Sequence, residues 1–174
     1  MYASTAFFGF KADGKRLGRY GGDIVVVPGS YQVAINNSKS EAINIGNGET
    51  KEIKLGTVRV LSTDGKTVSV TVFDANEKRL GFYGNDILLV PGSYRVSVNN
   101  KMSELIELTG GKFIEIKLGA INLKDRFEIY DDQGKRMGSF DGMLPLLPGS
   151  YSVKTKNSTF DNVKVIAGKV TDLN

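Results

Sequence analysis

The residues Pro-Gly-Ser-Tyr occur three times in this chain of 174 residues, and this repetition limits the folds open to it. The tetrapeptide begins at Pro28, Pro91 and Pro148, so its copies are 63 and 57 residues apart. A Lys-Arg pair recurs at the same two offsets, as Lys15-Arg16, Lys78-Arg79 and Lys135-Arg136. Recurrence of this kind indicates one supersecondary unit used several times. We therefore divide the chain into three repeats, residues 1–56, 57–119 and 120–174.

Each repeat has the sequence pattern of β-strands. In the second repeat, Val68, Val70 and Val72 alternate with polar residues, which is the period of a half-buried strand. With turns at Gly84–Asp86 and Asn99-Asn100, the same reasoning predicts further strands at Arg79–Tyr83, Ile87–Val90, Tyr94–Val98, Ile106–Leu108 and Phe113–Leu118. Because no segment has a helical period, the sequence predicts an all-β fold.

The residues that recur most strictly are of the kind that make turns. Proline presets φ and glycine completes the turn. The tyrosine that follows is expected to bury its ring and donate its hydroxyl to the backbone, as in the tyrosine corner of β-sandwiches. These structural turn residues are Pro28, Gly29, Tyr31, Pro91, Gly92, Tyr94, Pro148, Gly149 and Tyr151. Left-handed backbone is expected at two further sets, Gly48, Gly111 and Gly168, and Asn37, Asn100 and Asn157.

Two architectures are compatible with a threefold β repeat. The length of the repeats favours three tandem small Ig-like β-sandwich modules. The alternative is a closed threefold β-trefoil or β-prism, which are lectin-like folds built from shorter repeats. The junctions favour modules in fixed geometry, because Gly56–Leu61 and Gly119–Leu123 continue a strand pattern without a flexible linker.

All three repeats resemble a known class of domain, and the clearest matches lie in the third. Tyr130–Lys135 and Leu147–Val153 are similar to a turn and a strand of the small transthyretin-like or carboxypeptidase-regulatory-like β-sandwich modules, and of the related PEGA repeats. The Pro-x-Gly-Ala opening of PEGA repeats is missing. The resemblance implies non-catalytic modules, found in tandem in exported bacterial and archaeal proteins and often beside von Willebrand A domains. It therefore implies an extracytoplasmic location, in the periplasm, on the cell surface or secreted.

The composition excludes most catalytic chemistry. Histidine and cysteine are absent, which removes the Ser-His-Asp triad, imidazole acid–base catalysis, thiolate nucleophiles and the usual zinc sites. Asp131-Asp132 lies in a turn that lacks the alternating oxygen ligands of an EF-hand loop. The chain is therefore predicted not to be an enzyme, and to use no metal or cofactor.

Charge and hydropathy restrict the expected partners. The net charge of +4 is spread over all three repeats, whereas nucleic-acid-binding domains concentrate it on one face, so no specific nucleic acid is expected. No apolar run approaches the ~20 residues that span a bilayer. Met1–Phe10 lacks the basic start of a signal peptide.

The three Lys-Arg pairs are the candidate ligand-binding residues. Lys15, Arg16, Lys78, Arg79, Lys135 and Arg136 would form a ladder of positive charge for an acidic glycan or another polyanion. The structural interpretation is that they are solvated residues that discourage edge-to-edge aggregation. Three aromatic residues that also recur could bind sugars, or could pack across strands; they are Tyr20, Tyr83 and Phe140.

A structural function explains these features best. We expect a non-catalytic spacer or protein-interaction scaffold in a larger surface or envelope assembly, with protein partners. The alternative is a glycan- or polyanion-binding module that uses the Lys-Arg hairpins. An exposed strand edge could also accept an extended segment of a partner, which requires no signature residues.

Overall fold

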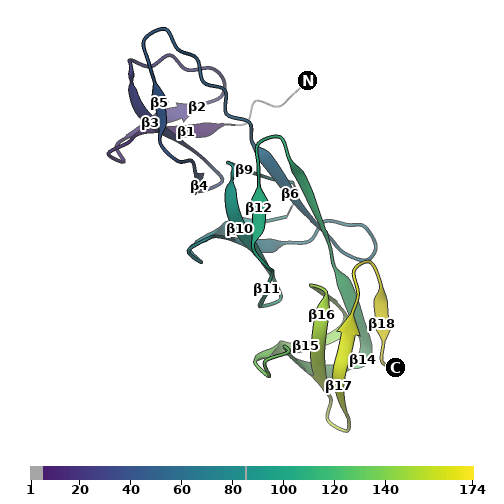
Figure 1. Cartoon of the computed structure of the whole chain (residues 1–174). Coiled ribbons are helices and arrows are strands. Elements are labelled where there is room, and N and C mark those ends of the chain that lie inside the picture. Colours follow the sequence, from purple (N-terminus) through teal and green to yellow (C-terminus); the bar gives the residue numbers. More distant parts are fainter. Residues whose placement is uncertain (1–5, 85) are drawn as a thin grey trace.

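The computed structural model describes residues 6–84 and 86–174. Met1–Thr5, at the start of the first repeat, and Asn85, in the turn predicted at Gly84–Asp86, lie outside the described residues. The described residues are all-β and form several separate sheets. They contain no helix, and so no helix that is long and apolar enough to cross a membrane. The groups of strands follow one another along a line, from the purple strands near the N-terminus to the yellow strands at the C-terminus (Figure 1).

The first repeat forms one antiparallel sheet. Its strands are β1 (Phe7–Lys11), β2 (Arg16–Tyr20), β3 (Gly29–Ile35), β4 (Ser38–Lys39) and β5 (Ile43–Ile45). The strand order is β2-β1-β3-β4, and β5 also pairs with β3. Residues 21–28 and 46–55 contain no strand.

The second repeat has two sheets. The first corresponds to the sheet of the first repeat and contains β7 (Val70–Asp74), β8 (Arg79–Tyr83), β10 (Gly92–Val98), β11 (Lys101–Met102) and β12 (Ile106–Leu108). The other has three strands in the order β13-β6-β9, namely β13 (Phe113–Lys117), β6 (Gly56–Leu61) and β9 (Ile87–Leu89). The central strand β6 runs parallel to β13 and antiparallel to β9.

The third repeat uses longer strands to make the same pairings. They are β14 (Gly119–Tyr130), β15 (Arg136–Leu146), β16 (Gly149–Lys154), β17 (Thr159–Val165) and β18 (Val170–Asp172). The first half of β14 pairs parallel with β18, as β6 does with β13, and its second half pairs with β16, as β7 does with β10. The single strand β14 thus makes the pairings that β6 and β7 make separately in the second repeat. It is continuous because the third repeat lacks the residues that separate β6 from β7.

Two hydrophobic cores lie in the second and third repeats. The core of the second repeat contains residues from both of its sheets, such as Val58 of β6, Leu89 of β9 and Val96 of β10. The core of the third repeat includes Ile121 and Ile129 from the two halves of β14. Among the described residues of the first repeat, the buried hydrophobic ones are only Tyr31, Ala34 and Ile35.

Local turn geometry follows the sequence with one exception. The predicted left-handed backbone is confirmed at Gly48, Gly111, Gly168, Asn37 and Asn100, with φ between 59° and 77°. It is wrong for Asn157, which has no positive φ. In the third repeat the Oγ1 of Thr155 accepts the N–H groups of Asn157 and Ser158 and closes a different loop.

The segment of the first repeat that corresponds to β13 was also expected to form a strand, and it does not. Residues 53–56 repeat the sequence of residues 116–119, yet residues 50–55 form no strand. The physical reason is the missing partner. In the second repeat β13 pairs only with β6, and the described part of the first repeat contains no equivalent of β6.

Candidate functional site

The three Pro-Gly-Ser-Tyr turns have the same structure. The hydroxyl of each tyrosine donates a hydrogen bond to the carbonyl of the residue before the proline. The distances are 2.6 Å from Tyr31 to Val27, 2.8 Å from Tyr94 to Val90 and 2.5 Å from Tyr151 to Leu147. Burial raises the pKa of Tyr94, and it also raises that of Tyr151, where the nearby carboxylates of Asp132 and Asp131 add to the effect. The hydrogen bond from each tyrosine hydroxyl to the backbone, which the sequence predicted, is thus confirmed.

The Lys-Arg pairs lie at the starts of equivalent strands in three different sheets, so they do not form one site. The guanidinium of Arg16 lies 4.2 Å from the centroid of the Phe8 ring, and that of Arg79 lies 3.9 Å from Phe82. Arg136 pairs with Glu128 at 2.7 Å. Each arginine therefore already contacts a neighbour in its own hairpin.

The lysine of each pair is held through its backbone. Asp13, Asp74 and Asp131 accept the backbone N–H groups of Lys15, Lys78 and Lys135, at 2.8, 2.9 and 2.8 Å respectively. This bond closes the turn that presents the pair. All three aspartates therefore act as turn residues, although Asp13 stands two positions later in its repeat than Asp74 and Asp131 do in theirs.

The recurring aromatic residues pack across strands. Tyr20 lies 5.8 Å from Phe7, and Phe140 lies 6.3 Å from Phe127, measured between ring centroids. Each ring covers the glycine two residues before it: a Cβ on Gly81 would come within 2.8 Å of the Tyr83 hydroxyl. Tyr83 has a further contact, because its hydroxyl donates to the carbonyl of Asn36 in the first repeat at 2.6 Å.

That contact belongs to a junction between the first and second repeats. The turn between β3 and β4 consists of Asn36 and Asn37, both left-handed. The side-chain amide of Asn36 donates to the carbonyl of Leu88 at 3.0 Å, and that of Asn37 donates to the carbonyl of Leu80 at 2.6 Å. The hairpin thus satisfies backbone carbonyls of the next repeat.

The second junction repeats this arrangement. The turn between β10 and β11 consists of Asn99 and Asn100, again both left-handed. Asn99 donates to the carbonyl of Pro145 and Asn100 to that of Met137, both at 2.8 Å. Pro145 and Met137 stand 57 residues after Leu88 and Leu80, so equivalent atoms are joined at both junctions.

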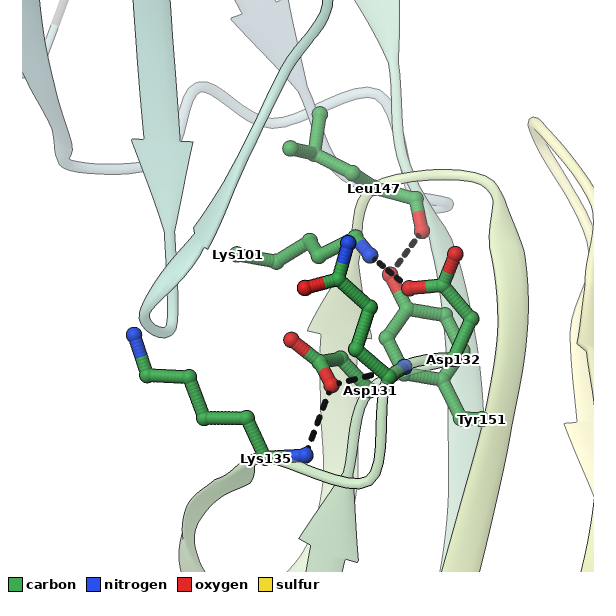
Figure 2. A network of polar contacts seen from close by, with 7 residues as sticks. Lys101, Asp131, Asp132, Lys135, Leu147 and Tyr151 are labelled. Carbon is green, nitrogen blue, oxygen red and sulfur yellow. Dashed lines mark hydrogen bonds and ion pairs between the residues drawn. The ribbon is translucent and has the colours of Figure 1, made fainter.

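The residue after each Asn-Asn turn differs between the junctions. At the first, Ser38 is buried, its Oγ lies 2.5 Å from the Tyr94 hydroxyl, and it accepts the N–H of Val90 at 3.2 Å. At the second, Lys101 takes the same position and pairs with Asp132 at 2.5 Å, beside the ring of Tyr151 (Figure 2). The hydrogen bond from Lys101 holds the pKa of Asp132 below its ordinary value.

An apolar contact accompanies the polar ones. Leu147, the residue before the third proline, is 5% exposed and belongs to the core of the second repeat. Val90 at the equivalent position is 0% exposed, whereas Val27 is 72% exposed. The side chain is buried where a preceding repeat covers it, so each junction combines an Asn-Asn hairpin with an apolar residue that points back into the repeat before it.

These junctions were not found from the sequence. The asparagines were recognised as turn residues, but which carbonyls face a turn depends on how whole sheets are placed. One signal was present: two adjacent asparagines recur at 36–37 and 99–100, and the third repeat, with Lys156 before Asn157, departs from them. Two consecutive turn residues conserved between only two repeats are consistent with two internal junctions.

Comparison with known proteins gives little further information. No family model matches the chain, and no curated protein matches it. Among solved structures, the Bacillus anthracis TIE protein is similar, with 16% sequence identity and a TM-score of 0.29. The match covers 98% of this chain and 46% of that one, so this chain spans about half the length of that protein. A similarity this low supports no argument about fold or function.

Proposed function

We propose that the chain is a non-catalytic spacer and protein-interaction scaffold, made of three tandem small Ig-like or transthyretin-like β-sandwich modules. The two sheets around one core in the second repeat support this architecture, as do the longer strands that make the same pairings in the third. The bounds of the modules are those of the repeats, 1–56, 57–119 and 120–174.

The repeated junction is the observation that carries the proposal. An independent pair of domains on a flexible linker has no reason to present the same donors to the same acceptors twice. Here Asn37 and Asn100 use the same amide bond, at equivalent positions, in both junctions. Directional bonds of this kind fix the orientation of one module on the next, which is what a spacer of defined length requires.

The assembly that this spacer serves is proposed to be extracytoplasmic, at a surface or envelope. The resemblance to modules of exported bacterial proteins supports this location. The alternative function, binding of a glycan or another polyanion, has less support, because Arg16, Arg79 and Arg136 already contact neighbours in their own hairpins.

Distance measurements between spin labels test the proposal. The chain has no cysteine, so Lys15→Cys with Lys78→Cys introduces one label at equivalent positions of two modules. We expect a narrow distance distribution that broadens when Asn37→Ala is added. The matched control is Asn157→Ala, which alters an asparagine outside the junctions and should leave the width unchanged. A broad distribution in the chain without Asn37→Ala would contradict a defined spacer.

A further inference from the structure

The first repeat contains a cavity that the other repeats fill. Its volume is about 660 Å³, and its walls include apolar residues such as Leu17, Ile24, Val26 and Val33. Leu17 and Val33 lie on β2 and β3 of the sheet, whereas Ile24 and Val26 lie in a segment without strand structure. This volume is within the range of about 300–1,000 Å³ that is typical of binding cavities, which are also lined mainly by apolar side chains.

The core of the second repeat shows what is missing. Its buried cluster contains Val58 and Val60 of β6 together with other residues of the core. Each of these other residues has a counterpart one repeat earlier in the sequence, 63 positions before it, or 57 positions before it in the case of Leu147. Every one of those counterparts lines the cavity; Leu17 corresponds to Leu80 and Ile24 to Ile87. Val58 and Val60 are the members that have no counterpart among the described residues of the first repeat. The cavity is therefore lined by the counterparts of the residues that form one core with β6 in the second repeat.

The backbone around the cavity leads to the same conclusion. In the second repeat, β9 and β13 have β6 as their common neighbour. Their counterparts in the first repeat, residues 24–26 and 50–54, contain no strand. These two segments can form a sheet only if a third strand lies between them, with hydrogen bonds to both.

Charge at the rim adds a preference. Arg59 of β6 stands between Val58 and Val60 and pairs with Asp86, with Nη2 and Oδ2 2.5 Å apart. That pairing, with a contribution from Glu115, raises the pKa of Arg59. The counterparts of these two acids, Asp23 and Glu52, line the cavity. A basic residue in the same place would meet the same two carboxylates.

We propose that this cavity, hereafter the strand groove, accepts an extended segment of another polypeptide chain by β-strand addition. The segment would have branched apolar residues at two alternate positions with a basic residue between them. It would run parallel to residues 50–54 and antiparallel to residues 24–26, as β6 runs relative to β13 and β9. Main-chain hydrogen bonds supply affinity in this mode of recognition and the alternate side chains supply specificity. This inference goes beyond the spacer function and stands independently of it.

A peptide with the sequence of residues 56–63 is the probe, added to the full chain and followed by calorimetry and amide hydrogen exchange. We expect saturable binding, together with new protection of the amides of residues 24–26 and 50–54. Replacing Val58 and Val60 by aspartate in the peptide should weaken binding by at least about tenfold, because each buried valine contributes roughly that much. Absence of binding, or binding without this protection, would overturn the proposal.

Variants of the groove separate this site from a nonspecific apolar surface. Val26→Lys, on the groove wall, should abolish binding, whereas Val27→Lys, exposed and outside the cavity lining, should not. Asp23→Lys should reduce the affinity by about threefold, and a peptide with glutamate in place of Arg59 should recover that loss. Equal effects of the two valine variants, or no recovery by the exchanged charge, would show that the peptide binds elsewhere.

Discussion

The first and second repeats share their turns, their tyrosine hydrogen bond and the apolar pattern of their main sheet, but they differ in burial. Ile87 and Leu89 are 2% and 0% exposed, whereas their counterparts Ile24 and Val26 are only half-buried. The tyrosine bond, by contrast, forms in both repeats. The turn is therefore a local structure that does not need a closed core, while burial of the sheet requires one additional strand, β6.

The largest effect expected from this comparison is a difference between two identical substitutions. Ile87→Ala removes a buried side chain and should lower the free energy of unfolding of the second repeat by about 2–5 kcal/mol. Ile24→Ala removes a half-buried side chain beside the groove and should cost the first repeat less than about 1 kcal/mol. Native-state hydrogen exchange, resolved by repeat, measures both. Equal losses would mean that the core of the first repeat is closed.

The tyrosine hydroxyls should differ in a similar way. Tyr94→Phe leaves the carbonyl of Val90 without its donor and the O–H of buried Ser38 without its acceptor, and should cost about 2 kcal/mol. Tyr31→Phe should cost about 1 kcal/mol or less, because the carbonyl of exposed Val27 can bond to water instead. Urea denaturation followed by hydrogen exchange gives the two values. A larger loss for Tyr31→Phe would show that the first turn depends on a covered environment.

The asparagines test whether the junctions stabilise the row. Asn100→Ala removes the amide bond to Met137 and places alanine at a φ of 66°, so a loss of about 1–2 kcal/mol is expected. Asn157→Ala is the matched control and should change stability by less than about 0.5 kcal/mol. Thermal unfolding by calorimetry compares them. Similar shifts for the two variants would argue against a contribution from the hairpin contact.

The smallest expected effect is the loss of the ion pair between Lys101 and Asp132 at acidic pH. Because the pKa of Asp132 is lowered in the folded chain by Lys101, its pairing stabilises the fold above the ordinary pKa near 3.9. That contribution is lost as the pH falls through the lower, folded-state value. Lys101→Met should return the pKa of Asp132 toward its ordinary value, measured by carboxyl carbon NMR. The first junction, with Ser38 in place of Lys101, should show no such dependence. An unchanged pKa in the variant would show that the pair does not form in solution.

The local features could be predicted from the sequence, because they depend on neighbouring residues. The alternation of Val70 and Val72 is enough to predict β7, and the order Pro-Gly-Ser-Tyr is enough to predict the bond made by Tyr94. Sites that depend on distant segments could not be predicted in this way. Asn37 was identified as a turn residue, but its partner Leu80 is 43 residues away and on another sheet.

The strand groove is an intermediate case. An alignment of the repeats places no described residue of the first repeat opposite Val58 or Val60 of β6. What the alignment does not show is that the remaining residues keep the shape of the space around that strand. That follows from the main sheet, whose pairings among β1, β2 and β3 do not involve it.

Small-angle X-ray scattering of the free chain tests the central claim most directly, because it reports the arrangement of all three modules. Three modules of about 60 residues held in a row should give a radius of gyration of roughly 24 Å and a length of about 80 Å. A compact globule of the same length, such as a β-trefoil or β-prism, should give roughly 16 Å. The larger value is the one the spacer account predicts, and the smaller value would contradict it.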